Sequence, residues 1–472
     1  MRNDLLIGTG ILGYLVFLLY IYMNILSSKA TFPAEVHFPD IKVKPVPNKI
    51  IPQQVHISYH SINSSTLVFT LKENANNCTI TYLNYTKNIS QPTNILRNSY
   101  IYKIILDSLP ENIEISYEIS CCKGENTFSK SSNFMSHPGL SENVSILVLG
   151  DWSTSNIGDI ENDQHTLIPK QHVLSAILKE ATPFTSIWHL GDIAYDLYSN
   201  YGSRGDEFLN DLEPLISKIP YMPVVGNHEI SEIFKDFTNR FSVPLFYSLP
   251  IGKATIIAIS SEFDYYLMKP ESFPYDHAIF NYLKHQQMTW LNDTLSSIDR
   301  NEFPWVIVMG HKPLYCSPNR WSTMIMKNCG IQAKVMRETF EEIFVKFKVD
   351  LYLSGHVHLY ERVFPVSFGK MHKNYEKEEK VFINPDAPIH IINGVAGNLE
   401  NTKIVFNVTD HPKEWSALIS ESLGYGILKI VNSTHLHYKQ FAFGNTQNDE
   451  ITEDLYSLKR LEDYFWIIKN AL

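Results

Sequence analysis

Five short segments of the chain share one pattern, in which an apolar run and a glycine are followed by a side chain that can bind a metal ion. These side chains are Asp151, Asp192, Asn227, His311 and His356. Such apolar runs predict buried strands, and the glycine permits a sharp turn at the strand end. Because open α/β sheets bind ligands at the carboxyl ends of their strands, we expect the five side chains to converge on one crevice.

Two of these segments carry a further donor. Tyr195 lies three residues after Asp192, and His358 lies two residues after His356. Seven donors exceed what one tetrahedral ion can use, so the sequence predicts two adjacent ions with one shared carboxylate. A phenolate with carboxylates favours a trivalent ion such as Fe(III), whereas neutral amide and imidazole groups suit a divalent first-row ion.

The motifs GDW, GDIAY, GNHE, VMGH and GHVH resemble the five-motif signature of the purple acid phosphatases, a branch of the metallophosphoesterases. The resemblance covers most of the chain. It implies a ferric ion held by Asp151, Tyr195, His358 and bridging Asp192. It also implies a divalent ion (iron, zinc or manganese) held by Asn227, His311, His356 and the same Asp192.

Two further residues of the GNHE motif acquire roles from this resemblance. His228 would lie beside the leaving group or the phosphoryl oxygens, and Glu229 would help to orient it. The implied reaction is hydrolysis of small phosphate monoesters by metal-bound hydroxide, with an acidic optimum because a trivalent ion keeps hydroxide available in acid. His228, protonated at low pH, would donate to the leaving alkoxide.

The chain departs from the family pattern at two places. Ser153 stands where the first motif has its second glycine, and Asn319, Arg320 and Trp321 stand where plant members have a histidine pair. Arg320 is either a source of positive charge for the phosphate or a solvated surface residue. The resemblance therefore implies no particular substrate.

Two other functions stay open at this point. One is a phosphodiesterase or nucleotide-cleaving activity, from which Tyr195 distinguishes the purple branch. The other is a catalytically weak, membrane-anchored binding or adhesion module, which degenerate ligands would favour. A net charge of −10 without a dense run of Lys or Arg argues against a nucleic-acid partner. Oligomeric state has no signature in the sequence.

The elements that must position the donors fall into two regions. Residues 51–137 contain short runs rich in β-branched and aromatic residues between Asn, Ser and Pro turns, which predicts a small all-β sandwich. Residues 143–442 alternate apolar runs with helical segments such as KQHVLSAILKEA and AKVMRETFEEIFVKF, which predicts an α/β domain. The resemblance makes the first region fibronectin type III-like and the second a two-sheet α/β/β/α sandwich. Residues 443–472 read as a tail or an amphipathic helix.

The N-terminus predicts export of the chain. Residues 5–26 carry no charge, so residues 1–28 form a signal peptide or a signal anchor, and residues 29–50 form a Pro- and Lys-rich linker. The catalytic domain would then be luminal or extracellular, in a secreted, lysosomal or membrane-anchored protein. Glycosylation acceptors occur at Asn63, Asn77, Asn84, Asn88, Asn143, Asn292, Asn407 and Asn432.

Five cysteines allow disulfides in an oxidising compartment. Cys316 and Cys329 are spaced to close a short local loop, and the surrounding GHKPLYCS text resembles the animal long form of the family. Cys78 is expected to pair with Cys121 or Cys122, which leaves one thiol over. Free buried cysteines are the alternative.

Overall fold

The fold is taken from a computed structural model, which describes residues 49–153, 169–180, 184–267, 276–317, 329–372, 375–376, 380–398, 413–443 and 459–470. The expected signal segment, nearly all of the expected linker, Asn407 and the stretch 319–321 lie outside these residues. Within the part of the chain that is described, no helix combines the length and the apolar character needed to cross a bilayer.

The N-terminal region is built from strands. They are β1 (Gln53–Ser61), β2 (Ser64–Leu71), β3 (Asn77–Tyr82), β4 (Tyr85–Ile89), β5 (Asn94–Leu96), β6 (Ser99–Leu106), β7 (Glu114–Lys123) and β8 (Asn126–Met135). They form two antiparallel sheets, with strand orders β1-β2-β6-β5 and β4-β3-β7-β8. Alternate side chains of both sheets, such as Ile57, Phe69, Ile80 and Ile119, share one buried cluster, so the two sheets enclose a common core.

A disulfide ties two neighbouring strands of this region. Cys78 on β3 lies directly opposite Cys121 on β7, and the two are bonded. Both are buried in the shared core. Cys122 is the next residue on β7, so its side chain points to the other face of the sheet, and it is free. Strand alternation therefore decides between the two partners that the sequence left open for Cys78.

The larger region contains two sheets. One has the order β13-β11-β9-β25-β26-β27-β22-β21 and the other β14-β15-β16-β17-β23-β18-β24. The first comprises β9 (Val144–Leu149), β11 (Ser186–His189), β13 (Tyr221–Pro223), β21 (Tyr375–Glu376), β22 (Val381–Ile383), β25 (Gly424–Ile430), β26 (His435–Phe443) and β27 (Lys459–Ile468). The second comprises β14 (Tyr247–Ile251), β15 (Ala254–Ala258), β16 (Trp305–Met309), β17 (Leu351–Ser354), β18 (Tyr360–Val363), β23 (Ile389–Asn393) and β24 (Ser416–Ser420).

Helices and short hairpins complete the described residues. The helices are α2 (Pro169–Leu178), α3 (Ser203–Ile216), the 3₁₀ turn η1 (Asn227–Glu229), α4 (Ser231–Arg240), α5 (Glu262–Leu267), α6 (Asp276–Ser297) and α7 (Cys329–Lys346). Two-stranded pairs are formed by β10 (Trp152–Ser153) with β12 (Ile193–Ala194), and by β19 (Val366–Ser367) with β20 (Lys370–Met371).

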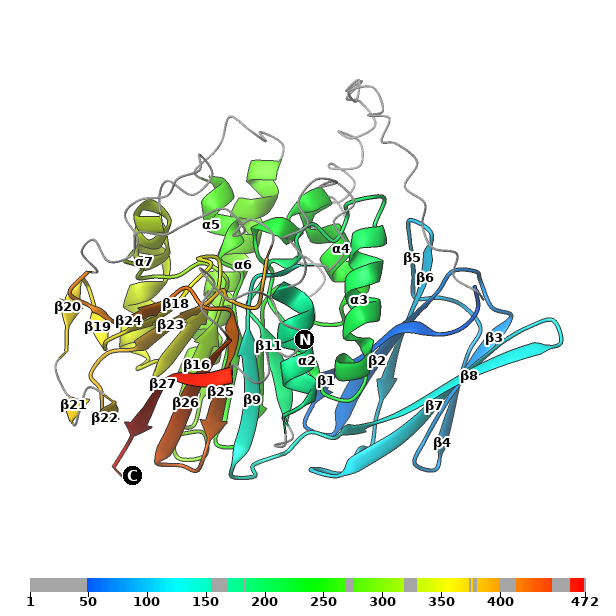
Figure 1. The fold of residues 1–472 in the computed structure, drawn as a ribbon, viewed down its shortest axis with the longest axis horizontal. Helices are drawn as coiled ribbons and strands as arrows, with labels where there is room; N and C mark the ends of the chain where they lie inside the picture. Colours follow the sequence, from blue (N-terminus) through cyan, green and yellow to red (C-terminus); the bar gives the residue numbers. More distant parts are fainter. Residues whose placement is uncertain are drawn as a thin grey trace, which may run out of the picture. The chain divides into compact units, whose positions relative to one another are not determined.

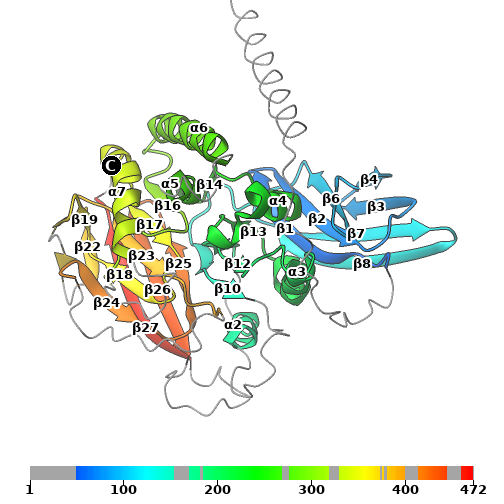
Figure 2. The ribbon, with the colours of Figure 1, turned by 90° about the horizontal axis from the view of Figure 1, so that it is seen from above.

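The layers follow from the alternation of side chains along each strand. On β16, Val306 and Val308 join a cluster with α6 and α7, which lie over one face of the seven-stranded sheet (Figures 1 and 2). The intervening Ile307 faces the other way. Tyr360 of the same sheet stacks at 6.4 Å on Tyr438 of the eight-stranded sheet, so the two sheets pack face to face. Phe208 of α3 contacts the far side of the eight-stranded sheet, which gives the expected order of helix, sheet, sheet and helix.

The C-terminal segment differs from expectation. Residues 443–472 were expected to form a tail or a helix, but residues 459–468 form strand β27, which pairs with β26 along its length. Phe465 and Ile467 are fully buried and alternate with partly exposed neighbours. This period of two matches a strand, and pairing with β26 in the sheet decides the conformation of this segment.

Candidate metal centre

The seven predicted donors come from two sheets. Asp151 follows β9, Asp192 follows β11 and Asn227 follows β13, all parallel neighbours in the eight-stranded sheet. His311 follows β16 and His356 follows β17, parallel neighbours in the seven-stranded sheet. Tyr195 and His358 lie a few residues further along. Asn227 is half-buried, and each of the other six side chains is at most 7% exposed.

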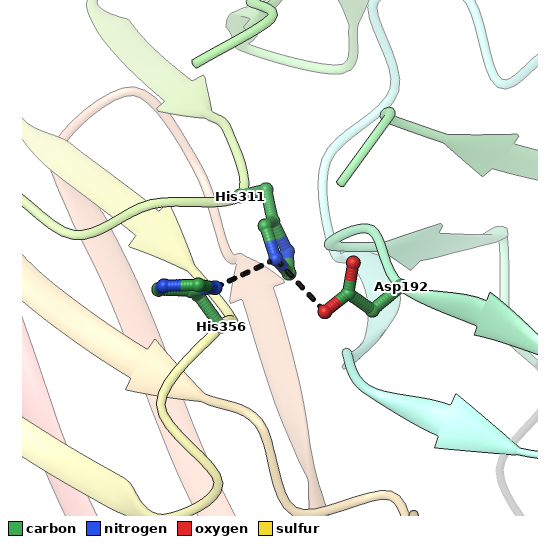
Figure 3. Close-up of side chains that lie close together, drawn as sticks. All are labelled: Asp192, His311 and His356. Atoms are coloured by element: carbon green, nitrogen blue, oxygen red, sulfur yellow. Dashed lines mark hydrogen bonds and ion pairs between the residues drawn. The ribbon is translucent and has the colours of Figure 1, made fainter. Parts of the chain in front are cut away.

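The first group of donors surrounds the Nε2 atom of His311. This atom lies 3.1 Å from Asp192 Oδ2, 3.2 Å from Asn227 Oδ1 and 3.1 Å from His356 Nδ1. Figure 3 shows the His311 ring between the other ring and the carboxylate. His311 Nδ1 donates to the carbonyl of Leu190 at 2.8 Å, which turns Nε2 toward the group.

The second group surrounds the Tyr195 hydroxyl. That oxygen lies 2.7 Å from His358 Nε2 and 3.3 Å from Asp151 Oδ1, and the latter two atoms are 3.4 Å apart. Ligand atoms of Asp151, Asp192 and His358 lie within 4.8 Å of one another, as do those of Asp192, His311 and His356. Asp192 therefore belongs to both groups.

These spacings fit ions bound by the donors. Neighbouring donor atoms are 2.7 to 3.4 Å apart in both groups. Donors about 2.0 to 2.1 Å from a shared tetrahedral ion would lie about 3.3 Å apart. The donor set, two carboxylates, a phenol, an amide and three imidazoles, is also the kind that binds first-row metals. Both the geometry and the chemistry of the residues therefore suit a pair of ions.

Two of the glycines before the donors are required for a reason that the sequence did not reveal. A Cβ atom on Gly226 would lie 2.3 Å from Asp192 Oδ1, and one on Gly355 would lie 2.4 Å from Asp151 Oδ2. Neither glycine has a left-handed backbone. Each is required because a carboxylate from a neighbouring loop crosses close to its Cα. The left-handed conformation occurs at Gly191, with φ of 85°, and also at three donors, with φ of 60° at Asp151, 54° at Asp192 and 68° at His356.

Glu229 is placed differently from the expected role beside His228. Its carboxylate accepts three backbone N–H groups, from Gly226 at 2.8 Å, Asp192 at 2.9 Å and Ile193 at 2.8 Å. Glu229 therefore joins the loops after β11 and β13. Burial and the nearby charge of Asp192 raise the pKa of Glu229 to about 8. The sequence motif places this carboxylate next to a histidine, but the fold turns it toward backbone amides.

His228 is oriented by another carboxylate. Its Nδ1 donates to Asp196 Oδ1 at 2.9 Å, and its ring packs on that of Tyr195 with centroids 4.4 Å apart. The Nε2 atom lies 4.0 Å from Asp192 Oδ2, so it faces the donor groups. The side chain remains 18% exposed, whereas the three donor imidazoles are at most 7% exposed. No sequence motif singled out Asp196, although it directly follows Tyr195.

Charges within the groups shape the protonation states. Burial alone would raise the pKa of Asp192, but the charges of His311 and His228 outweigh burial and hold the pKa well below 3.8. Burial lowers the pKa of His311, but the attraction of Asp192 is stronger and raises it to about 9. Burial, with the charges of Lys312 and His311, holds the pKa of His356 well below 6.5. His356 is thus ready to bind a metal, whereas His311 would release a proton on binding one.

Ser153, the departure in the first motif, is accommodated by a hydrogen bond. Its backbone N–H donates to the Gly397 carbonyl at 3.0 Å, and its hydroxyl donates to the same oxygen at 3.2 Å. Ser153 and Trp152 form β10, which pairs with the segment after Asp192. The loop that carries Asp151 is therefore held by backbone pairing without the second glycine.

Two more residues escaped the sequence analysis. Lys312 is fully buried and forms an ion pair with the equally buried Glu262, directly behind His311. Gln332 of α7 contacts His356, with Oε1 2.6 Å from Nε2. A lysine after the histidine in VMGHK was a visible signal, because a buried lysine needs a partner. Gln332 lies 24 positions from His356, and no local pattern marked it.

The chain is similar in sequence to known metallophosphoesterases. The sequence profile of the calcineurin-like phosphoesterases matches residues 144–360, and that of the iron/zinc purple acid phosphatase-like protein C matches residues 387–450. An acid phosphatase type 7 of Danio rerio is 31% identical over 84% of this chain and 89% of its own length. The Fe(3+)-Zn(2+) purple acid phosphatase 12 of Arabidopsis thaliana is 26% identical over 84% of this chain and 82% of its own.

A solved structure has a similar fold. The purple acid phosphatase PPD1 from seeds of yellow lupin, Lupinus luteus, superposes with a TM-score of 0.71. The match covers 89% of this chain and 75% of that chain at 19% sequence identity. At this identity the likeness concerns the fold alone.

Proposed function

The chain belongs to the purple acid phosphatase family, and from this premise we propose that it hydrolyses small phosphate monoesters in acid with a pair of metal ions. The observation that carries the proposal is the meeting of two donor groups at Asp192. When bound, such a pair neutralises the phosphoryl oxygens and lowers the pKa of a bound water.

We assign the ions to the two groups by donor chemistry. The phenol and carboxylate oxygens of Tyr195, Asp151 and Asp192, with His358, would hold Fe(III). Asn227, His311 and His356, with the same Asp192, would hold the divalent ion, which is iron, zinc or manganese. The spacing supports the second grouping, since His356 Nδ1 and Asn227 Oδ1 lie 3.1 and 3.2 Å from His311 Nε2.

His228 is the proposed proton donor to the leaving group. It is the imidazole at the site that keeps some exposure to solvent, and its Nε2 faces the donor groups. Asp196 accepts from Nδ1 and so fixes the ring with Nε2 toward the substrate. Glu229 supports the reaction from behind, by joining the loops of Asp192 and Asn227 through backbone amides.

A direct test combines metal analysis with a choice of substrates. The purified chain should contain two metal ions, and in mildly acidic buffer it should hydrolyse p-nitrophenyl phosphate faster than bis(p-nitrophenyl) phosphate. Tyr195→Phe should remove the visible phenolate-to-iron absorption band while the protein stays folded. A preference for the diester, or two bound metals without turnover of either substrate, would contradict the proposal.

We also propose that the chain is exported. Two disulfides favour an oxidising compartment. Of the predicted glycosylation acceptors, Asn63, Asn84, Asn88 and Asn143 are exposed, and Asn77, Asn292 and Asn432 are half-buried. A secreted, lysosomal or membrane-anchored location is compatible with these features. Mobility shifts after glycosidase treatment of Asn→Gln variants would test the exposed acceptors.

The domain boundaries are part of the same proposal. Residues 51–137 would form a fibronectin type III-like domain, which the pair of four-stranded antiparallel sheets supports. Residues 143–442 would form the metallophosphoesterase domain. Because β27 continues the eight-stranded sheet, we extend that domain to residue 468.

A further inference from the structure

The first turn of α7 lies against one of the metal-site histidines. Gln332 Oε1 is 2.6 Å from Nε2 of His356, while Nδ1 of the same ring is 3.1 Å from His311 Nε2. Because Nδ1 faces the donor group, the ring hydrogen belongs on Nε2, and Gln332 accepts it. Within the described residues, His356 is the one donor of the seven that forms a hydrogen bond with Gln332.

The same helix is fastened to the segment that follows His311. The three links are a hydrogen bond of 2.6 Å from Arg337 Nη1 to the Leu314 carbonyl, a hydrogen bond from the Tyr315 hydroxyl to Glu341, and the disulfide between Cys316 and Cys329. Three consecutive residues after the histidine loop are therefore tied to α7. Cys329 begins α7 and precedes Gln332 by three residues, about one helical turn.

The disulfide also packs on the segment that carries both histidines of the GHVH motif. Its sulfur-bearing residues form a buried cluster with Ala333, Val357, Leu359 and Ile392. Val357 lies between His356 and His358 in sequence. The start of α7 is thus held both to the His311 loop and to the His356 loop, and Gln332 lies where the two attachments meet.

Gln332 is not required here as packing. Its side chain is half-buried, and the preceding Ile331 is 49% exposed. A glutamine at such a position contributes little through packing, so its main interaction with the site is the hydrogen bond to the His356 ring. A polar side chain that fixes the far nitrogen of a ligating histidine holds the ring orientation and its tautomer.

We propose that Gln332 is a positioning residue for the divalent ion, and that the Cys316–Cys329 disulfide holds Gln332 against His356. The proposal rests on the proposed function, because it uses the assignment of His356 to that ion. Because Fe(III) is assigned to the other group, the effect of Gln332 should be confined to the divalent ion.

The first experiment measures Zn²⁺ affinity in the full chain after its divalent ion has been removed. Gln332→Leu, which keeps the size but loses the acceptor, should weaken Zn²⁺ binding by about 10- to 100-fold. Gln332→Glu restores an acceptor and should bind Zn²⁺ at least as tightly as the native chain. Ile331→Ala is the matched control on the same helical turn and should leave the Zn²⁺ affinity unchanged.

The visible absorption band of the iron site separates this role from general damage. The band should keep its position and intensity in Gln332→Leu. Unchanged Zn²⁺ affinity in that variant would overturn the inference, and so would parallel loss of both metals with a lowered melting temperature. If the native chain bound no pair of metals, the proposed function itself would fail, which is a distinct result.

The second experiment tests the disulfide. Cys316→Ser with Cys329→Ser should weaken Zn²⁺ binding. Adding Gln332→Leu to this variant should lower the Zn²⁺ affinity by a smaller factor than it does in the native chain, because both changes act on one contact. Cys78→Ser with Cys121→Ser removes the other disulfide and should leave Zn²⁺ affinity unchanged. Fully additive effects, or equal effects of the two disulfides, would show that the Cys316–Cys329 disulfide does not act through Gln332.

Discussion

The two sheets that form the metal centre contribute different chemistry. The eight-stranded sheet and its loops supply oxygen donors, namely two carboxylates, a phenol and an amide. The seven-stranded sheet supplies three imidazoles. Each proposed ion takes donors from both sides, so neither sheet contains a complete site. The difference indicates that metal binding depends on how the sheets face each other as much as on either set of strand ends.

Protein contacts away from the site fix that relation. Asp463 on β27 of the eight-stranded sheet is fully buried and accepts from Arg362 Nε at 2.7 Å and from the Tyr360 hydroxyl at 2.8 Å, both on β18 of the seven-stranded sheet. Asn393 Nδ2 on β23 donates to the Val148 carbonyl of β9 at 3.2 Å. The sheets are therefore joined by polar bonds that do not involve the metal donors.

The largest effect is expected where both groups meet. Asp192→Ala removes the shared carboxylate and should release both ions, with a loss of kcat/KM of about a thousandfold or more, because the electrostatic stabilisation by both metals goes with it. Metal content and activity of the purified variant would be measured together. Retention of two tightly bound ions in this variant would contradict the shared role.

The comparison becomes sharper with one histidine from each group. His356→Ala should lose the divalent ion and keep the iron absorption band, whereas His358→Ala should weaken or abolish that band. Both changes lie on the same short segment after β17, so they serve as controls for each other. Metal analysis and visible spectra would decide. Identical loss of both ions in the two variants would argue against separate groups.

His228 departs from the division between oxygen donors and imidazoles, since it is an imidazole on the side of the eight-stranded sheet. We propose that it acts on the substrate and binds no metal. His228→Asn should slow hydrolysis of alkyl phosphates by about a hundredfold or more, since their leaving alkoxide needs a proton. Hydrolysis of p-nitrophenyl phosphate should fall much less, because its leaving group departs as a stable anion. Both metals should remain. Equal losses on both substrates would contradict the proposed proton transfer.

The smallest effect is expected from the link remote from the metals. Asp463→Asn should lower the free energy of unfolding by about 2 kcal/mol, as a charge-assisted hydrogen bond is weakened, with both metals retained. Burial would raise the pKa of Asp463, but Arg362 and Lys380 hold it below 3.8. A carboxyl whose pKa is lower in the folded state stabilises the fold at pH values above its pKa in the unfolded chain. This contribution is lost as the pH falls through its pKa in the folded state.

The difference between native and variant stability should therefore be the same at neutral and mildly acidic pH, and shrink only below about pH 3.8. Urea titrations across this range would measure it. A difference that disappears at mildly acidic pH would show that the pKa is not lowered.

Local sequence was most informative where the pattern and the element coincide. The apolar runs before Asp151, Asp192, Asn227, His311 and His356 are all strands, and the two helical segments are α2 and α7. Local sequence was less informative where contacts with distant segments decide the role of a residue. The roles of Gly226 and Gly355 depend on carboxylates from other loops, and Glu229 turns toward backbone amides instead of His228. The strand β27 depends on pairing with β26.

By itself the sequence determined the kinds of donor and their place at strand ends, because residue type and hydrophobic period are local properties. The reaction class came from the resemblance of the five motifs to a known family. Tertiary structure decided which donors meet. His356 Nδ1 and His311 Nε2 are 3.1 Å apart, although 45 residues separate them, and Asp151 accepts from the backbone of His356 across 205 residues. Such distances are set by the packing of one sheet on another, which no single segment encodes.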